Sequence, residues 1–370
     1  MKTVITGSAG LLGWHLRCYL SVLDGWKDQV VALDRQSFND EATLVSALEG
    51  ADVVVHCAGV NRADDSELEQ GNIALAQRLV DGLVAAGSTP HVVYANTIHK
   101  HKGTPYGRGK AGADRVFREG VEKSGARYTE LVLPHVFGEG GRPFYNSATL
   151  TFCQQIVNGE PLNIHPGGQL ELLHAQDICV ELVSAVERGH SGELRLKGRT
   201  VTPAEVAGKL ESMHASYTNH VMPDLREGFD LQLFNTLRSF LYPAHYPVAL
   251  KLNTDNRGSL FEAVKADNGG QAFLSTTKPG ITRGNHFHFG KVERFLVIRG
   301  EAVIRLRRLF DDEVTEFRVS GSEPVYVDMP TLHTHNITNV GDEELMTMFW
   351  SHEIFDPENP DTYFLPVGQE

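Results

Sequence analysis

The glycine-rich turn near the N-terminus constrains the fold of this chain most. A run of β-forming residues at positions 3–6 leads into Gly7, Gly10 and Gly13, and a helical pattern covers residues 13–20. Glycines at this spacing permit a tight turn and bring the backbone close to a pyrophosphate, while the start of the helix supplies N–H groups. The segment predicts a dinucleotide-binding α/β fold.

A second strand ends in two residues of opposite charge. Residues 30–33 form the pattern VVAL, and Asp34 and Arg35 follow where such folds meet the adenosine ribose. Asp34 would accept hydrogen bonds from the 2′-hydroxyl of NAD, whereas Arg35 would pair with the 2′-phosphate of NADP. The residue types alone leave this choice open.

Strands and helices then alternate. The stretch DVVVHCAG (52–59) predicts a strand that ends in the small residues Cys57, Ala58 and Gly59, and a helix over 72–86 and a strand over 91–95 follow. Such alternation predicts a doubly wound parallel sheet with a ligand cleft at the carboxyl ends of its strands.

Three residues with acid–base or hydrogen-bonding groups follow at this edge of the predicted sheet. Thr97 comes directly after a strand, and Tyr106 and Lys110 lie one turn apart on a predicted helix that runs towards residue 125. Ketone reduction needs a proton donor beside the carbonyl oxygen, and a nearby ammonium lowers the pKa of a phenol. The run HKHK (99–102) has charges that suit phosphates, but we favour its interpretation as a solvated loop.

The set GSAGLLG, DVVVHCAG, Thr97 and YGRGK resembles the extended short-chain dehydrogenase/reductase family over residues 1 to about 240. The resemblance implies that Tyr106 is the acid/base, that Lys110 also binds the nicotinamide ribose, and that LPHVFG (133–138) lies beside the nicotinamide. His135 stands where the family pattern has Asn. The implied cofactor contacts are Gly7, Ala9, Gly10, Leu11, Gly13, Asp34, Arg35, Cys57, Ala58, Gly59, Tyr106, Lys110 and Pro134.

Members of that family that act on nucleotide sugars place the substrate against regions that correspond to residues 145–146 and 173–177. The resemblance therefore implies a nucleotide-sugar substrate, with Asn146 and His174 as candidate contacts. Further along, the capping box TPAE at 202–205 predicts a helix from residue 203 to about 215.

The pattern changes near residue 250. Short strands are predicted over 272–276, 294–298, 302–307, 314–319, 324–327 and 344–350, a spacing typical of an antiparallel sandwich or barrel. A chain of 370 residues also exceeds the size at which one hydrophobic core stops growing. We predict two domains, 1–245 and 252–370, with Pro243 and Pro247 in the linker between them.

The second half contains a cluster of metal-ligand residue types. His286 and His288 are two residues apart and would project from one face of a strand, with Glu293 on the next strand and His335 further along. The spacing from 280 to 300 and the later H-x3-N resemble the two motifs of the cupin family, with Leu332 in place of the usual glycine. The cupin resemblance implies an antiparallel β-barrel.

Three imidazoles and one carboxylate suit zinc, iron, manganese or nickel, and we take zinc as the first choice. Two alternatives remain: these are core histidines that bind no metal, or the metal only stabilises the fold.

The order of a reductase followed by a cupin resembles bifunctional bacterial enzymes of the UDP-N-acetyl-L-fucosamine pathway, which serve capsule and O-antigen synthesis. The resemblance implies that the cupin epimerises carbon 3 of a UDP-4-keto-6-deoxy-N-acetylhexosamine, that the first domain reduces carbon 4 with NADPH, and that the chain forms a homodimer. The ketone acidifies the proton on carbon 3, and its reduction fixes the new configuration. His333 and Lys291 are both candidates for the epimerisation base.

Two other functions remain open. One is an NAD(P)-dependent nucleotide-sugar 4-epimerase or reductase whose cupin serves only dimerisation. The other is a nucleotide- and sugar-sensing scaffold without catalysis. The formal charge of −13, from 34 Lys and Arg against 47 Asp and Glu, disfavours nucleic acid and anionic membrane surfaces as partners. The four cysteines lack paired spacing, and we predict that they are small buried residues. The sequence opens with a strand-like segment and contains no apolar run of membrane-spanning length, and we predict a cytoplasmic protein.

Overall fold

The computed structural model describes residues 1–164, 167–267 and 269–368. Its contacts divide the chain into two compact units. The first unit comprises Met1–Thr151 and Asn163–Val206, and the second comprises Phe152–Leu162 and Ala207–Glu370. These units are defined by contacts, and the domain bounds 1–245 and 252–370, which concern independent folding, remain a prediction.

The first unit is built on a six-stranded parallel sheet with the order β2-β1-β3-β4-β5-β8. The chain moves outwards in one direction from β1 to β2 and in the other from β3 onwards, so a topological switch point lies beside β1. The predicted doubly wound sheet is confirmed. Its strands are Thr3–Thr6 (β1), Val30–Leu33 (β2), Val53–His56 (β3), His91–Thr97 (β4), Tyr128–Leu133 (β5) and Gly192–Arg195 (β8).

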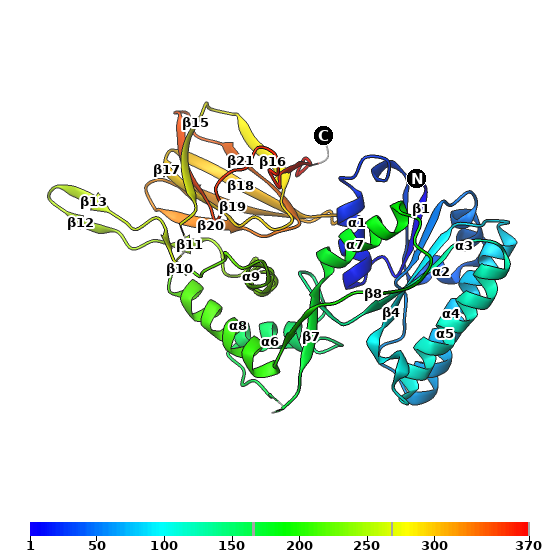
Figure 1. Cartoon of the computed structure of the whole chain (residues 1–370). Helices are drawn as coiled ribbons and strands as arrows, with labels where there is room; N and C mark the ends of the chain where they lie inside the picture. The colour runs from blue at the N-terminus through cyan, green and yellow to red at the C-terminus, as the bar shows by residue number, and fades with distance from the viewer. Residues whose placement is uncertain (165–166, 268, 369–370) are drawn as a thin grey trace. The chain divides into compact units, whose positions relative to one another are not determined.

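Helices cover both faces of this sheet (Figure 1). Because successive strand residues point to opposite faces, Val4 joins the core formed with α3, α4 and α5, whereas Ile5 joins the core formed with α1 and α7. The helices are α1 (Leu11–Leu20), α2 (Arg35–Asn39), α3 (Glu41–Leu48), α4 (Asp65–Ala85), α5 (Pro105–Lys123) and α7 (Ala175–Glu187), with short turns η1 (Lys27–Gln29) and η2 (Ile98–His101).

Capping side chains set the first residue of helices α4 and α8. Helix α4 begins at Asp65 rather than at the predicted residue 72, because the Asp64 carboxylate caps it by accepting the Glu67 N–H at 2.9 Å. Helix α8 (Pro203–Thr218) begins where the capping box predicts: the Thr202 hydroxyl accepts the Glu205 N–H at 3.1 Å, and the Glu205 carboxylate accepts the Thr202 N–H at 2.6 Å.

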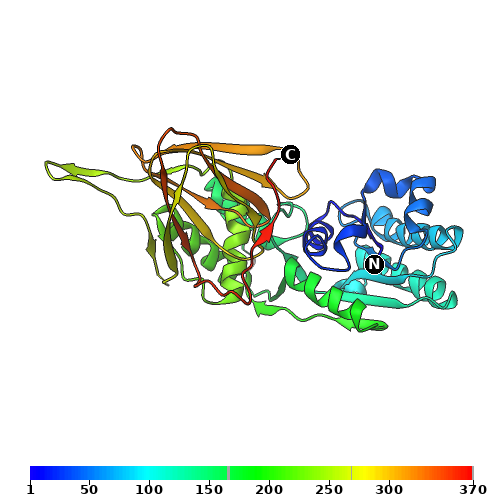
Figure 2. The same cartoon turned by 90° about the horizontal axis from the view of Figure 1, so that it is seen from above.

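The second unit contains two five-stranded antiparallel sheets, β11-β20-β17-β22-β15 and β19-β18-β21-β16-β23 (Figure 2). Apolar residues from both sheets, such as Phe295, Leu306 and Ile337, form one core. The antiparallel β architecture is therefore confirmed. Its strands are β11 (Val248–Ala249), β15 (Gln271–Thr277), β16 (Thr282–Phe287), β17 (Glu293–Arg299), β18 (Glu301–Arg308), β19 (Val314–Ser320), β20 (Val325–Met329), β21 (His333–Asn339), β22 (Leu345–Ser351) and β23 (Tyr363–Phe364).

Several smaller elements complete the chain. Strands β6 (His135–Phe137), β7 (Leu170–His174) and β9 (Arg199–Val201) form a small sheet, and β10 (Val221–Met222) pairs with β14 (Lys265–Ala266). The hairpin of β12 (Asn253–Asp255) and β13 (Gly258–Leu260) is exposed and extends away from the rest of the second unit in both ribbon views. The remaining helices are α6 (Ala148–Asn158) and α9 (Gly228–Leu241).

The segment predicted as a linker is part of a packed core. Tyr246 is 7% exposed and Val248 9% exposed, and both contact the apolar residues between the two sheets. The segment around Pro243 and Pro247 therefore packs within the second unit, and its role as a linker between independently folding domains stays a prediction. Proline correctly marks an end of helix α9, but the residues that follow are apolar and become buried.

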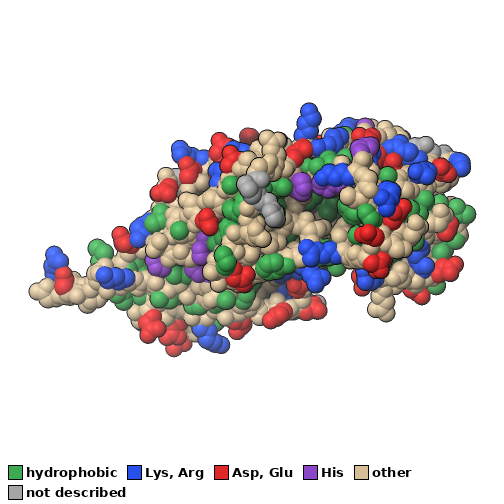
Figure 3. Space-filling model, turned by 90° about the horizontal axis from the view of Figure 1, so that it is seen from below, with side chains coloured by type: hydrophobic (Ala, Val, Ile, Leu, Met, Phe, Trp, Pro, Cys, Tyr) green, Lys and Arg blue, Asp and Glu red, His purple; other side chains and the backbone are tan. Residues whose placement is uncertain are grey.

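The surface carries interspersed charges. Acidic and basic side chains alternate over the face drawn in Figure 3, without one continuous patch of a single sign. Among the described residues, none of the helices combines the length and the apolar character that a membrane span requires. All four cysteines are free. Cys18, Cys153 and Cys179 are buried, and Cys57 is half-buried.

Candidate active sites

A cavity of about 580 Å³ lies where β1, β3, β4 and β5 end. A volume of this order suits a small-molecule ligand, and the carboxyl edge of a parallel sheet is where such ligands bind. The structure thus brings together residues that are up to about 140 positions apart. The predicted site residues in its wall are Gly7, Ala9, Gly10, Leu11, Gly13, Cys57, Gly59, Thr97, Tyr106, Lys110, Pro134 and Asn146.

The glycine turn at this cavity leaves no room for side chains. A Cβ on Gly7, whose φ is +65°, would lie 2.7 Å from the Ala58 nitrogen, and a Cβ on Gly13 would lie 2.4 Å from the Gly7 oxygen. Gly10 is the N-cap of α1 and donates its N–H to the Gly7 carbonyl at 3.0 Å. The start of α1 therefore borders the cavity, where its N–H groups favour a phosphate.

Asp34 and Arg35 lie at the end of β2, outside the residues that line the cavity. Asp34 is the N-cap of α2: its carboxylate accepts hydrogen bonds from the Ser37 N–H at 2.8 Å and the Ser37 hydroxyl at 2.6 Å. These hydrogen bonds hold the pKa of the Asp34 carboxyl below its usual value. Asp34 thus stabilises the start of α2, and the adjacent Arg35 is exposed.

Thr97, Tyr106 and Lys110 line the same cavity. Thr97 is the last residue of β4, and Tyr106 and Lys110 lie one turn apart near the start of α5. The Lys110 ammonium donates to the Ala95 carbonyl at 2.9 Å and lies 4.3 Å from the centre of the Tyr94 ring. The three predicted catalytic residues therefore border one cavity.

Burial governs the acidity of Tyr106 and Lys110. It lowers the pKa of the Lys110 ammonium to about 7, and together with Tyr145 it raises the pKa of the Tyr106 phenol to about 12. The groups that shift the pKa of Tyr106 do not include Lys110, so the lowering of the phenol pKa by the ammonium stays a prediction. Tyr106 is protonated at neutral pH and able to donate a proton.

A buried charge network supports this wall, and the sequence interpretation missed it. The Glu130 carboxylate, on β5, accepts hydrogen bonds from Lys100 at 2.6 Å, Arg118 at 2.7 Å and the Asn96 amide at 2.6 Å. The Asn96 amide oxygen in turn accepts the Thr97 N–H at 2.9 Å. The solvated loop predicted at 99–102 is wrong for Lys100, which is 7% exposed because Glu130 neutralises it.

The two candidate substrate residues differ in their placement. Asn146 lies in the cavity wall. His174 lies outside it: it is buried, caps α7, and its Nε2 is 3.0 Å from the Glu139 carboxylate. Although burial alone would raise it, the pKa of Glu139 is lowered to about 2 by His174 and His15. This buried hydrogen bond gives His174 a structural environment rather than a position against a ligand.

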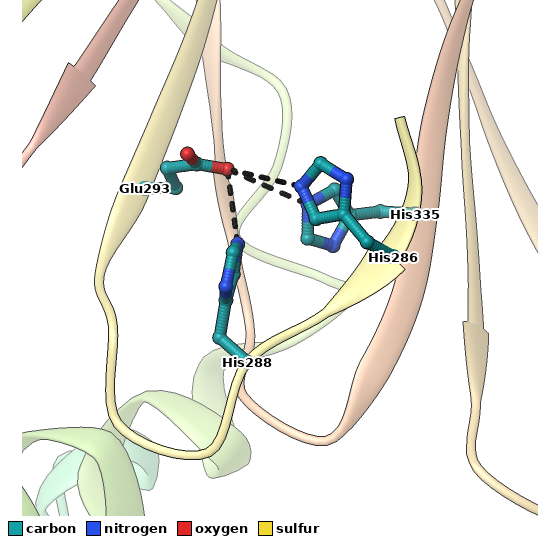
Figure 4. A group of neighbouring side chains, drawn as sticks. All are labelled: His286, His288, Glu293 and His335. Atoms are coloured by element: carbon teal, nitrogen blue, oxygen red, sulfur yellow. Dashed lines mark hydrogen bonds and ion pairs between the residues drawn. The ribbon is translucent and has the colours of Figure 1, made fainter. Parts of the chain in front are cut away.

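In the second unit, His286, His288, Glu293 and His335 form one cluster (Figure 4). Their ligand atoms all lie within 4.8 Å of one another. The Glu293 Oε2 atom lies 3.1 Å from His288 Nε2, 3.5 Å from His335 Nε2 and 3.8 Å from His286 Nε2. Strands β16, β17 and β21, together with the turn that follows β16 and carries His288, thus direct three imidazoles and one carboxylate to a single point.

The proton positions in this cluster fit a divalent cation. The Nδ1 atoms of His288 and His335 face the carbonyl oxygens of Asp361 and His333, so in the neutral rings Nδ1 carries the proton and Nε2 a lone pair. His335 Nε2 is buried without a hydrogen-bond partner. Three imidazole nitrogens that converge beside a carboxylate suit a divalent transition metal.

Leu332 occupies a backbone conformation that glycine favours. Its φ is +58°, and its side chain is 1% exposed in the turn before β21. The sequence comparison with the cupin motif expected glycine here, and the structure explains why: the turn requires the left-handed region, which costs a non-glycine residue roughly 1–2 kcal/mol. The buried leucyl side chain offsets part of this cost.

The two candidate bases differ in how they are held. His333, on β21, donates Nδ1–H to the Thr331 carbonyl at 2.9 Å, which leaves the lone pair on Nε2. The Lys291 ammonium instead donates to the Pro360 carbonyl at 2.5 Å and lies 3.8 Å from the Glu353 carboxylate. Lys291 is thus engaged by the C-terminal segment.

The fold and the two sites define a two-part class: a dinucleotide-binding sheet with a Thr, Tyr and Lys wall, joined to antiparallel sheets with a His and Glu cluster. Residues 3–195 match the NAD dependent epimerase/dehydratase family, and the chain belongs to this family, which implies that it binds NAD or NADP. Residues 253–363 match the polysaccharide biosynthesis C-terminal domain.

Two relatives are similar over the whole chain. UDP-2-acetamido-2,6-beta-L-arabino-hexul-4-ose reductase of Pseudomonas aeruginosa is 30% identical, with 100% of each chain covered. The crystal structure of the capsular polysaccharide assembling protein CapF from Staphylococcus aureus is 36% identical, with a TM-score of 0.64 and coverage of 99% of this chain and 100% of that chain. The predicted resemblance to a reductase–cupin family is confirmed.

A more distant structure shares the fold alone. DesIV, a dTDP-glucose 4,6-dehydratase from Streptomyces venezuelae, has 21% identity and a TM-score of 0.56, with coverage of 66% of this chain and 98% of that chain.

Proposed function

We propose that this chain is a bifunctional nucleotide-sugar enzyme of capsule or O-antigen precursor synthesis. The second unit epimerises carbon 3 of a UDP-4-keto-6-deoxy-N-acetylhexosamine, and the first unit reduces the ketone at carbon 4 with NADPH. The observation that carries this proposal is that one chain holds both the Thr97, Tyr106 and Lys110 wall and the His and Glu cluster. The full-length similarity to a UDP-sugar reductase supports it.

In the reductase site, NADPH supplies the hydride when bound. The close backbone approach at Gly7 and Gly13 and the start of α1 fit its pyrophosphate. Tyr106 donates its proton to the oxygen of the ketone, since burial keeps the phenol protonated. Thr97 orients that oxygen, and Lys110 binds the nicotinamide ribose.

We propose NADPH rather than NADH because the Asp34 carboxylate is engaged in capping α2, whereas the Arg35 guanidinium is exposed. The cap consists of two hydrogen bonds from Ser37 to the Asp34 carboxylate. A guanidinium recognises a 2′-phosphate by charge-assisted hydrogen bonds. Arg35→Ala should therefore raise the KM for NADPH at least tenfold and leave the KM for NADH unchanged; equal effects on both cofactors contradict the assignment.

In the epimerase site, His286, His288, Glu293 and His335 hold a divalent metal, for which zinc is our proposal. Such an ion supplies positive charge that stabilises negative charge on a substrate oxygen. We assign the base to His333, because its Nδ1–H is fixed on the Thr331 carbonyl and Nε2 is left to accept the proton from carbon 3. A proton from solvent, returned to carbon 3 on the opposite face, then completes the inversion. Lys291 is the less suitable candidate, since its ammonium is held by Pro360 and Glu353.

The decisive experiment is hydrogen exchange in deuterated water. Incubation with the UDP-4-keto-sugar in the absence of NADPH should introduce deuterium at carbon 3, and His333→Gln should abolish this exchange. Tyr106→Phe should keep the exchange but lose NADPH oxidation by at least a hundredfold, which separates the two reactions. Absence of exchange in the wild-type protein rejects the epimerase and leaves a reductase with a structural second unit.

We also propose a cytoplasmic homodimer, as the cofactor and the nucleotide sugar require access to soluble metabolite pools. Strand β15 is the last strand of its sheet and exposes Phe273 and Leu274, an arrangement that favours association of two copies. Light scattering after size exclusion measures the mass. A species of 40.8 kDa, the mass of one chain, contradicts the dimer.

A further inference from the structure

The turn that carries metal-ligand candidate His288 is held by a residue far along the chain. Residues 288–292 connect β16 of one sheet to β17 of the other, so this turn places His288 opposite Glu293. Strand β23 pairs with the end of β16, with Phe287 opposite Tyr363. This pairing brings Asp361, two residues before β23, alongside the turn.

The Asp361 carboxylate binds three successive backbone N–H groups of the turn. It accepts hydrogen bonds from Phe289 at 2.9 Å, Gly290 at 2.9 Å and Lys291 at 2.8 Å. A carboxylate that occupies such a concave set of N–H groups makes charge-assisted hydrogen bonds, which are stronger than neutral ones. The side chain of Asp361 therefore fixes the backbone of this turn.

The main chain of Asp361 acts on His288 directly. Its carbonyl oxygen accepts a hydrogen bond from His288 Nδ1. Because a carbonyl only accepts, the proton of the neutral ring lies on Nδ1 and the lone pair on Nε2, which points at Glu293 in Figure 4. Metal-bound histidines are commonly oriented by such an outer hydrogen bond.

The backbone of Asp361 is itself unusual. Its φ is +38°, in the left-handed region that non-glycine residues other than Asn and Asp rarely adopt. This conformation allows one residue to direct its carboxylate to the turn and its carbonyl to the imidazole.

We propose that Asp361 is a positioning residue of the metal centre, which holds His288 in the Nδ1-protonated form and keeps its turn in a ligating geometry. The inference rests on the proposed metal centre. It concerns how that centre is built, and adds to the four ligands a residue that is 73 positions away from His288.

The test is zinc affinity in the full-length protein, measured by competition with a chromophoric chelator. Asp361→Asn keeps the size of the side chain and tolerates the left-handed backbone, but it removes the charge and directs an amide N–H2 at N–H donors. We expect zinc to bind ten- to a hundredfold more weakly, a range typical of losing an outer partner. The control Asp356→Asn, whose carboxylate accepts the Glu358 N–H at 2.9 Å in the same segment, should retain wild-type affinity.

A second pair of variants separates positioning from general destabilisation. In a His288→Ala background, Asp361→Asn should change zinc affinity by less than about threefold, because the residue through which Asp361 acts is gone. Equal losses in both backgrounds overturn the proposal. Unchanged affinity of the single variant also overturns it, whereas failure of the wild-type protein to bind zinc removes the metal centre together with this inference.

A measurement on the wild-type protein avoids any variant that fails to fold. Nitrogen-15 NMR of the histidine side chains in the zinc-loaded protein distinguishes the two ring forms, with His288 assigned by His288→Gln. The proposal requires a protonated Nδ1. A protonated Nε2 at this residue contradicts it.

Discussion

Replacement of Lys110 with methionine should stabilise the cofactor-free protein while it abolishes reduction. Lys110 is 5% exposed, and burial lowers its pKa from 10.5 to about 7. The folded state thus disfavours the charged form by about 5 kcal/mol, at about 1.4 kcal/mol per pKa unit, and this cost is present in full below pH 7. The reductase site therefore retains a residue that weakens the fold.

Methionine has a similar length and no charge, but it loses two contacts. The hydrogen bond to the Ala95 carbonyl and the contact with the Tyr94 ring together contribute about 2–3 kcal/mol. We therefore expect Lys110→Met to raise the free energy of unfolding by about 2 kcal/mol at pH 7. Because the unfolded lysine keeps its proton up to about pH 10.5, wild-type stability should rise between pH 7 and 10, and this rise should be absent in the variant.

Denaturant unfolding from pH 6 to 9 without NADPH measures both effects. Tryptophan fluorescence reports on the first unit through Trp14 and Trp26. Lys123→Met, at the exposed end of the same helix, is the matched control and should follow the wild-type curve. A destabilised Lys110→Met at pH 7, with a pH profile parallel to that of the wild type, refutes the reasoning.

Three further predictions concern stability and ligand binding. Glu130→Ala should lower the free energy of unfolding by about 3 kcal/mol because it leaves Lys100 buried with half of its ion pairs, whereas Glu193→Gln, at the exposed partner, should change it by less than about 1 kcal/mol. Gly13→Ala should abolish NADPH binding in a fluorescence titration, since its Cβ meets the Gly7 carbonyl, whereas Gly208→Ala, exposed within α8, should keep binding and add about 0.5–1 kcal/mol of stability. A chelator should lower the melting temperature, and zinc should restore it.

Each of these predictions has an outcome that contradicts it. Equal losses of stability in Glu130→Ala and Glu193→Gln would mean that the buried Lys100–Glu130 ion pair contributes no more to the free energy of unfolding than the Lys100–Glu193 pair. Tight NADPH binding by Gly13→Ala would remove the steric argument for the glycine turn. A melting temperature that is indifferent to both chelator and zinc would show that the His and Glu cluster gains no stability from metal.

Regular patterns made much of the fold predictable. The alternation of strands and helices predicted the parallel sheet, and the capping box at 202–205 predicted the start of α8. The spacing of His286, His288, Glu293 and His335 predicted a cluster that the structure forms. In each case the signal lies within a short stretch or in a motif with a fixed spacing.

Contacts between distant residues left no such signal. Glu130 is one acidic residue in the strand YTELVL, and nothing local indicates that Lys100, 30 positions away, neutralises it. The role of Asp361 depends on the pairing of β23 with β16, which no periodicity encodes. Helix α4 began earlier than predicted because its first turns are polar, and only the Asp64 cap marks its start.

The interleaved course of the chain limits how the two chemistries can be taken apart. The segment 152–162 and helix α9 belong to the second unit although they precede its sheets, and the Tyr217 hydroxyl donates to the buried Asp328 carboxylate at 2.6 Å. A truncation near residue 250 would remove the sheets against which segment 152–162 and helix α9 pack, and it would leave the Tyr217 hydroxyl without the Asp328 carboxylate. Protein engineers who exchange halves between relatives should therefore transplant the helices together with the sheets, or dissect the activities by point substitution alone.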